Sequence, residues 1–346
     1  MEKTVISKLL TWYSKNKRDL AWRSTNSKKT INPYYTFVSE YMLQQTTVST
    51  VKNRFEKFIF NWPTINDFAI INENKILSFW SGLGYYSRAR NLLKSAKIIK
   101  KKFNSKIPEN YNDLISLPGI GDYTAKAILG IAYNKSVMPI DANIERILCR
   151  LYGFNLPINK IKNEIKAKAN NFISKNNSSD LIQSFMDYGS IICKPKKPNC
   201  LDCVIKKNCI AYRENLQNII PLKLKNKSSK RKKYSRAYIF YNEKNEILVR
   251  KRSSEGMLPS MLEIPNDNWV INKKSLVYDK IVLKLKNKLE YKGSLAYSFS
   301  HFDLSTEVFF AKVKKKCFSN QKWIKINCVD TSSLPTVMKK IIQIGL

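Results

Sequence analysis

Four cysteines confined to one short segment constrain this chain more than any other feature of its sequence. They follow the spacing Cys193-x6-Cys200-x2-Cys203-x5-Cys209, whereas the other three cysteines, at 149, 317 and 328, are isolated. An odd total with one tight group is not typical of a secreted disulfide framework. Four thiolates on a short loop can instead surround a soft metal centre. Two centres remain open: an iron–sulfur cluster, or a zinc ion, although zinc ligands usually come as two close pairs.

The charge balance points to a polyanionic partner. Lys and Arg number 62 and Asp and Glu 26, which gives a net charge of +36. Nucleic acid is the first candidate for such a surplus, although the abundance of Lys, Asn and Ile also fits an AT-rich genome. The 43% of hydrophobic residues excludes global disorder. The sequence has neither a run of about 18 apolar residues nor a signal peptide, so we expect an intracellular protein without a membrane span.

The spacing of apolar residues changes once along the sequence, from a helical to a strand-like pattern. Apolar residues recur at helical spacing from 5 to 212. Residues 223–233 then hold seven basic residues and no acid, a composition that cannot form a core. Beyond them, alternating runs at 238–241, 247–249 and 308–313 indicate strands, and 333–344 indicates a closing helix. We predict a mainly α domain over 1–212, a basic linker over 213–233 and an α+β domain over 234–346.

A glycine-rich turn, Leu117-Pro118-Gly119-Ile120-Gly121, separates two helical patterns. Its glycines permit a tight turn, and the free amides of the next helix suit a phosphate oxygen. Some twenty residues later comes Pro139-Ile140-Asp141-Ala142-Asn143. Position alone favours Asp141 as the cap of the helix that follows.

Together these motifs resemble the helix–hairpin–helix, Gly/Pro-rich, Asp superfamily of DNA glycosylases, which includes endonuclease III. The cysteine spacing resembles the iron–sulfur loop of that superfamily, so the resemblance implies a 4Fe–4S cluster held by Cys193, Cys200, Cys203 and Cys209. It also implies that Gly119 and Gly121 bind DNA phosphates. By the same resemblance Asp141 faces the sugar of a flipped nucleotide. A fixed carboxylate at that place would stabilise the cation that develops when an N-glycosidic bond breaks.

Within the superfamily, the segment Ser39-Glu40-Tyr41-Met42-Leu43-Gln44-Gln45-Thr46 resembles that of the adenine DNA glycosylase (MutY) family. The resemblance makes Glu40 the general acid that protonates the departing adenine, where a solvated helical glutamate is the alternative. Tyr123 stands where strand-cleaving members carry a lysine, which favours simple hydrolysis, and with Asn143 it would shape the catalytic pocket. The same resemblance assigns the adenine pocket to Arg18, Trp22, Leu43 and Gln183, and the DNA wedge to Gln45 and Tyr85.

The C-terminal domain resembles a Nudix domain. Its Phe299-Ser300-His301 string, which holds the only histidine in the sequence, resembles the loop with which the same family reads 8-oxoguanine. The resemblance therefore assigns lesion recognition to Phe299, Ser300 and His301. The carboxylate-rich metal box of active Nudix hydrolases is missing: after Glu263 only Asp267 appears before Asp279. We expect no pyrophosphatase site.

The sequence is thus similar to monofunctional adenine DNA glycosylases of base excision repair. The resemblance implies a monomer in the bacterial cytoplasm, at the nucleoid, that acts on double-stranded DNA with adenine opposite 8-oxoguanine or G. Three departures stand out: Ala142 replaces a glycine, Ala21 replaces a proline, and 256–265 lacks the family's glycine pair and aromatic. The alternatives are an endonuclease III-like glycosylase/lyase, a non-catalytic DNA-binding protein and a nucleotide-pool hydrolase.

Overall fold

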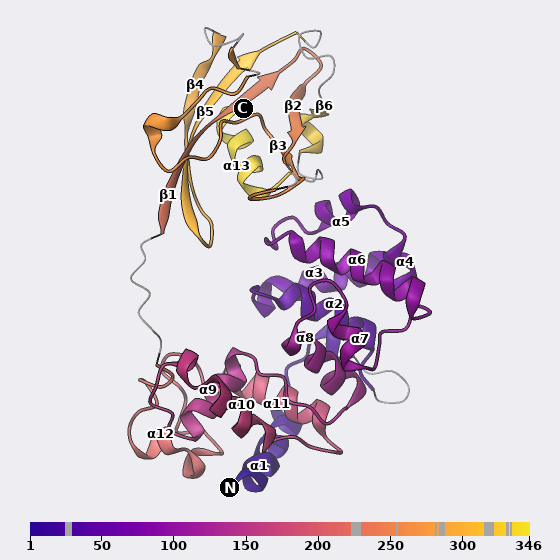
Figure 1. The fold of residues 1–346 in the computed structure, drawn as a ribbon, viewed down its shortest axis with the longest axis vertical. Coiled ribbons are helices and arrows are strands. Elements are labelled where there is room, and N and C mark those ends of the chain that lie inside the picture. The colour runs from indigo at the N-terminus through magenta and orange to yellow at the C-terminus, as the bar shows by residue number, and fades with distance from the viewer. Residues whose placement is uncertain are drawn as a thin grey trace. The chain divides into compact units, whose positions relative to one another are not determined.

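The computed structural model describes residues 1–24, 30–222, 230–253, 255–280, 282–283, 288–314, 322–329, 332 and 334–346. Most of the basic segment therefore lies outside the described residues. The chain divides by its contacts into two compact units, the first formed by Met1–Ile71 with Ser87–Asn226 and the second by Asn72–Tyr86 with Lys227–Leu346. The first is helical and the second carries the sheet (Figure 1). The predicted fold class, a mainly α region followed by an α+β region, is confirmed.

The first unit is built from helices. They are α1 (Glu2–Asn16), α2 (Pro33–Leu43), α3 (Val48–Asn61), α4 (Ile65–Ala69), α6 (Ser87–Lys102), α7 (Tyr111–Ile115), α8 (Asp122–Ala127), α9 (Ala142–Leu151), α10 (Lys162–Asn170), α11 (Ser178–Ile191) and α12 (Ile210–Arg213). Short turns include η1 (Ala21–Arg23) and η2 (Ile128–Ala132), and η2 extends α8. Helix α11 packs against both α1 and α9, so residues from the two ends of the unit share one core.

The predicted hairpin joins α7 to α8 and is fixed from two sides. Gly119 has φ +83°, and a Cβ there would lie 2.9 Å from the Asn91 side chain. The Tyr41 hydroxyl of α2 and the Ser95 hydroxyl of α6 both donate to the Pro118 carbonyl, at 2.5 and 3.0 Å. The turn is therefore anchored to α2 and α6 as α8 begins.

The second unit holds β1 (Arg231–Tyr241), β2 (Glu246–Lys251), β3 (Leu262–Glu263), β4 (Glu290–Ser298), β5 (Phe302–Lys312) and β6 (Lys322–Lys325). It also holds α5 (Glu73–Phe79) and α13 (Thr336–Gly345). The sheet order is β3-β2-β1-β5-β4, with β6 paired to β2. Strands β1 and β5 are parallel, and the other pairs are antiparallel. Helix α13 packs on β1, β4 and β5.

The predicted runs at 238–241 and 247–249 lie in β1 and β2, and the run at 308–313 lies in β5 except for its last residue. Strand β1 begins earlier than its apolar pattern, at Arg231, inside the segment read as linker. Arg231 pairs with Phe302 of β5 while its own side chain remains exposed. Backbone pairing requires no apolar side chain, which is why composition did not reveal this start. No described helix is long and apolar enough to cross a membrane.

Candidate active site

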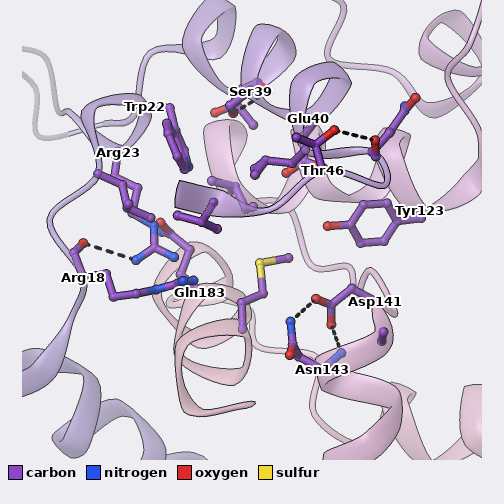
Figure 2. Close-up of a pocket in the computed structure, with 18 of the residues that line it drawn as sticks. Arg18, Trp22, Arg23, Ser39, Glu40, Thr46, Tyr123, Asp141, Asn143 and Gln183 are labelled. Atoms are coloured by element: carbon purple, nitrogen blue, oxygen red, sulfur yellow. Dashed lines mark hydrogen bonds between the residues drawn. The ribbon is translucent and has the colours of Figure 1, made fainter. Parts of the chain in front are cut away.

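A pocket in the first unit brings together residues that lie far apart in the sequence (Figure 2). Its cavity measures about 590 Å³, which falls within the range of small-molecule sites. It is lined by the residues predicted to be catalytic, to hold adenine and, in one case, to wedge the DNA: Glu40, Tyr123, Asp141, Asn143, Arg18, Trp22, Leu43, Gln183 and Gln45. We call it the Glu40–Asp141 pocket.

Glu40 lies on α2, a helix that Asn32 caps and Pro33 begins. Its side chain is only 6% exposed, so it is not a solvated surface glutamate. Burial raises the pKa of Glu40 from 4.5 to about 7, the Tyr123 hydroxyl opposes this shift, and the Asp141 charge adds to it. A carboxyl with this pKa is protonated often enough at neutral pH to act as a proton donor.

Tyr123 faces Glu40 from the first turn of α8. Burial, followed by the charges of Glu40 and Asp141, raises the pKa of Tyr123 well above 10. It therefore remains a neutral hydroxyl that can donate a hydrogen bond. The nearest lysine along α8, Lys126, pairs with Asp122 at 2.8 Å and does not line the pocket.

Asp141 both caps α9 and lines the pocket. One carboxylate oxygen accepts from the backbone amides of Asn143 and Ile144, at 2.9 and 2.7 Å. The other accepts from the Asn143 side-chain amide at 2.7 Å. The positive end of the helix dipole favours a negative charge at this position. Position in the sequence favours capping and the family resemblance favours catalysis, and the geometry permits both roles at once.

Two arginines that sequence reasoning missed connect this site to the cysteine segment. Arg146 donates to the Asn143 side-chain oxygen at 2.9 Å and to the Cys193 carbonyl at 2.7 Å. Arg150, one turn further along α9, donates to the Cys193 sulfur at 3.2 Å and to the Lys194 carbonyl at 2.7 Å. Both are buried. The sequence signal that could have identified them is a pair of arginines four residues apart on an otherwise apolar helix face.

The opposite wall of the pocket comes from η1 and α11. Trp22 packs edge-on against Phe55, with 5.4 Å between ring centroids. The Gln183 amide nitrogen donates to the backbone oxygen and the hydroxyl of Ser179, at 3.2 and 3.1 Å. Its buried oxygen has no hydrogen-bond partner within the described parts of the chain. Arg18 lies beside Gln183 in Figure 2, so an acceptor and a cationic donor share this wall.

The end of α2 is held by a buried cation. Arg88 donates to Thr46 Oγ1 at 3.0 Å and to three backbone carbonyls at the helix end, those of Tyr41, Met42 and Gln44. This satisfies carbonyl groups that a helix end leaves without partners. Gln45, with φ +55°, stands exposed in the loop that Arg88 fixes. The other predicted wedge residue, Tyr85, belongs to the second unit and is 43% exposed.

The four clustered cysteines line one small cavity. Burial raises the pKa values of Cys200 and Cys203, and that of Cys209 to about 11, so a positive centre is needed to hold them as thiolates. Among the described residues, no three Cys, His, Asp or Glu side chains are arranged to hold a single metal ion. Four thiols lining one cavity form a donor set that fits a soft metal centre. Cys149 is buried and Cys328 exposed, and Cys317 lies outside the described residues.

In the second unit the predicted lesion-reading loop is the turn between β4 and β5. Ser300 and His301 are exposed, and Phe299 is anchored in an aromatic cluster with Trp269, Tyr297 and Phe302. The Phe299 amide donates to the Phe302 carbonyl at 2.9 Å, which closes the turn. Ser300 and His301 are thus exposed beside an anchored aromatic cluster, an arrangement suited to contact a ligand.

The carboxylates that remain from the Nudix pattern are committed to ion pairs. Arg250 binds Glu263 at 2.7 Å and Asp279 at 2.5 Å. Arg236 binds Asp267 at 2.5 Å. Paired in this way, these carboxylates are not available as a set of metal ligands, which disfavours the nucleotide-pool hydrolase.

Comparison with known proteins agrees with this geometry. Residues 38–174 match the family model of the HhH-GPD superfamily base excision DNA repair proteins, and residues 236–343 match that of the NUDIX domain. The solved structure of a thermostable thymine-DNA glycosylase is 28% identical with a TM-score of 0.56, and the match covers 62% of this chain and 97% of that one. An endonuclease III–DNA complex, 20% identical with a TM-score of 0.52, shares the fold over 62% of this chain and 96% of its own.

Relatives that match nearly the whole chain identify the family more narrowly than the family models and solved structures do. The adenine DNA glycosylase of Buchnera aphidicola subsp. Schizaphis graminum is 34% identical over 97% of both chains. That of Buchnera aphidicola subsp. Acyrthosiphon pisum is 33% identical over 99% of this chain and 98% of its own. Since the similarity spans both units at this level, the chain belongs to the adenine DNA glycosylase family of the HhH-GPD superfamily.

Proposed function

We propose that this protein is a monofunctional adenine DNA glycosylase that excises adenine opposite 8-oxoguanine, or G, from duplex DNA. One observation carries the proposal: a buried, protonatable Glu40 and a rigidly held Asp141 line the same pocket of about 590 Å³. A flipped purine needs both groups, because its base leaves more readily when protonated and its sugar becomes cationic.

The two carboxyl groups have different roles in the reaction. Glu40 donates a proton to a ring nitrogen of adenine as the N-glycosidic bond breaks. Asp141, oriented by Asn143 and the start of α9, stabilises the positive charge on the sugar. Glu40, now ionised, accepts the proton of the attacking water, and the products are free adenine and an abasic site. Tyr123, in place of a lysine, leaves no amine in the pocket for a Schiff base.

Recognition is shared by the two units. The Gln183 acceptor and the Arg18 donor suit adenine, which offers an amino donor beside a ring-nitrogen acceptor. The hairpin glycines Gly119 and Gly121 approach phosphates, while Gln45 and Tyr85 take the place of the flipped base. In the second unit Phe299, Ser300 and His301 read the opposite 8-oxoguanine. The protein acts as a monomer.

The four cysteines would hold a 4Fe–4S cluster in this function. The cluster would contribute structural cross-linking of residues 193–209 rather than a reaction step. Arg146 and Arg150 join that segment to α9, so the segment supports the helix that begins at Asp141.

The test is single-turnover base release from duplexes with adenine opposite 8-oxoguanine, G or T. We expect strand breaks only after alkali, fastest opposite 8-oxoguanine, and none with Glu40→Gln. Glu56→Gln, which changes an exposed glutamate of the adjacent α3, should behave as wild type. Cleavage without alkali on an oxidised-pyrimidine duplex would favour the endonuclease III-like alternative instead.

A further inference from the structure

Asp187 of α11 is a fully buried carboxylate that the proposed chemistry does not use. One oxygen accepts from the Arg18 backbone amide and Arg23 Nη1, at 3.0 and 2.7 Å. The other accepts from Arg18 Nε and Arg23 Nη2, at 2.7 and 2.8 Å. Burial alone would raise the pKa of Asp187, but the hydrogen bonds and charges of Arg23 and Arg18 outweigh it and lower the pKa. The side chain is therefore an ionised anchor for two cations.

Both anchored arginines flank the same short turn. The segment between them contains η1 and carries Trp22, and Arg18, Trp22 and Arg23 all line the Glu40–Asp141 pocket. Asp187 itself does not line the pocket. One carboxylate thus fixes both ends of the turn, although it does not line the cavity where a base would lie.

The sequence offers a reason for this turn to need an anchor. Ala21 stands at its start, and unlike proline an alanine does not restrict φ. Within the turn, the Arg23 amide donates to the Leu20 carbonyl at 2.8 Å. The bidentate contact between Arg23 and Asp187 adds a fixed planar geometry that a single local hydrogen bond cannot supply.

We propose that Asp187 is a positioning residue for adenine selectivity, which sets Arg18 and Trp22 against Gln183 through this turn. The inference rests on the proposed adenine excision. With Asp187 in place, the Arg18 donor lies beside the Gln183 acceptor, and the pocket matches a purine that carries an exocyclic amine. Without it, Arg18 and Trp22 lose their fixed positions relative to Gln183. Glu40 and Asp141 lie on other elements and keep their positions.

The test compares two bases in otherwise identical duplexes: adenine, and unsubstituted purine, which lacks the amine. For Asp187→Asn we expect single-turnover release of adenine to slow roughly 10- to 100-fold, as for the loss of a well-oriented polar contact, and release of purine to slow much less. The ratio of the two rates should therefore fall. Asp180→Asn, the same charge change at an exposed position of α11, should leave both rates unchanged.

A second variant guards against misfolding of the first. Arg23→Lys keeps the charge but removes the bidentate contact, and it should lower the same ratio with circular dichroism like that of wild type. An equal loss on both bases in either variant, or an unchanged ratio, would overturn the inference. If the wild-type protein releases neither base, the proposed function itself is wrong, and that outcome is distinct from a failure of the Asp187 inference.

Discussion

The buried carboxyl of Glu40 should make both stability and activity depend on pH in a calculable way. Its pKa is about 7 in the folded protein and 4.5 without burial. Between these values the folded state holds a proton that the unfolded state has released, so the free energy of unfolding falls as pH rises through this window. At 1.36 kcal/mol for each unit of pKa, the full loss is about 3 kcal/mol.

Glu40→Gln removes this titration, because the glutamine amide is always neutral. Relative to wild type, the variant should gain about 3 kcal/mol of stability above about pH 8 and almost nothing below about pH 4.5. It should also lose base release. In the wild type, the rate should fall about tenfold for each pH unit above 7, because only the protonated acid can donate.

Both quantities can be measured on the same samples. Denaturant unfolding at about pH 5, 7 and 9 gives the stability difference between wild type and Glu40→Gln. Single-turnover adenine release at the same pH values gives the activity, with Glu56→Gln as the control. Parallel stability curves for the two proteins, or a wild-type rate that is flat from pH 7 to 9, would refute this account of Glu40.

Three further outcomes are expected. Asp141→Asn should reduce base release by about 10²–10³-fold. It should change the melting temperature little, because asparagine caps a helix as well as aspartate does. A large drop in melting temperature would reassign Asp141 to capping alone. Arg88→Met should weaken base flipping, measured as fluorescence of 2-aminopurine at the target position, whereas Lys94→Met on the exposed face of α6 should not. Borohydride should trap no covalent adduct with wild-type protein but should trap one with Tyr123→Lys; a strong wild-type adduct would indicate a strand-cleaving enzyme.

Sequence motifs singled out several residues that the structure gathers in one pocket. Glu40 and Asp141 are about a hundred residues apart, yet the structure brings them into one pocket with Tyr123 and Asn143. Tyr123 follows a glycine turn and Asp141 caps a helix, whereas Glu40 lies well inside α2 and was predicted from the resemblance of its segment to a known family. Such features depend on neighbours in the sequence, and for that reason they are visible without a structure.

The supporting charges could not be predicted in the same way. Asp187, Arg88 and Arg146 lie on helices whose apolar periodicity indicates burial, but a buried charge is tolerated only with a partner. Those partners lie elsewhere in the chain: Asp187 meets Arg18 across 169 positions and Arg88 meets Tyr41 across 47. No local pattern specifies such pairings. The start of β1 at Arg231 was missed for a related reason, since its backbone pairs with a distant strand.

The contact between Arg18 and Asp187 also has a consequence for how the protein is made. At the usual elongation rate of about 5–20 residues per second, the ribosome adds the intervening 169 residues in roughly 10–30 seconds. Throughout that interval the first helix has been synthesised, but its partner α11 has not. A nascent chain that stalls before α11 therefore carries Glu40 and even Asp141 without a closed pocket, so truncated products should be inactive toward DNA bases rather than unselective.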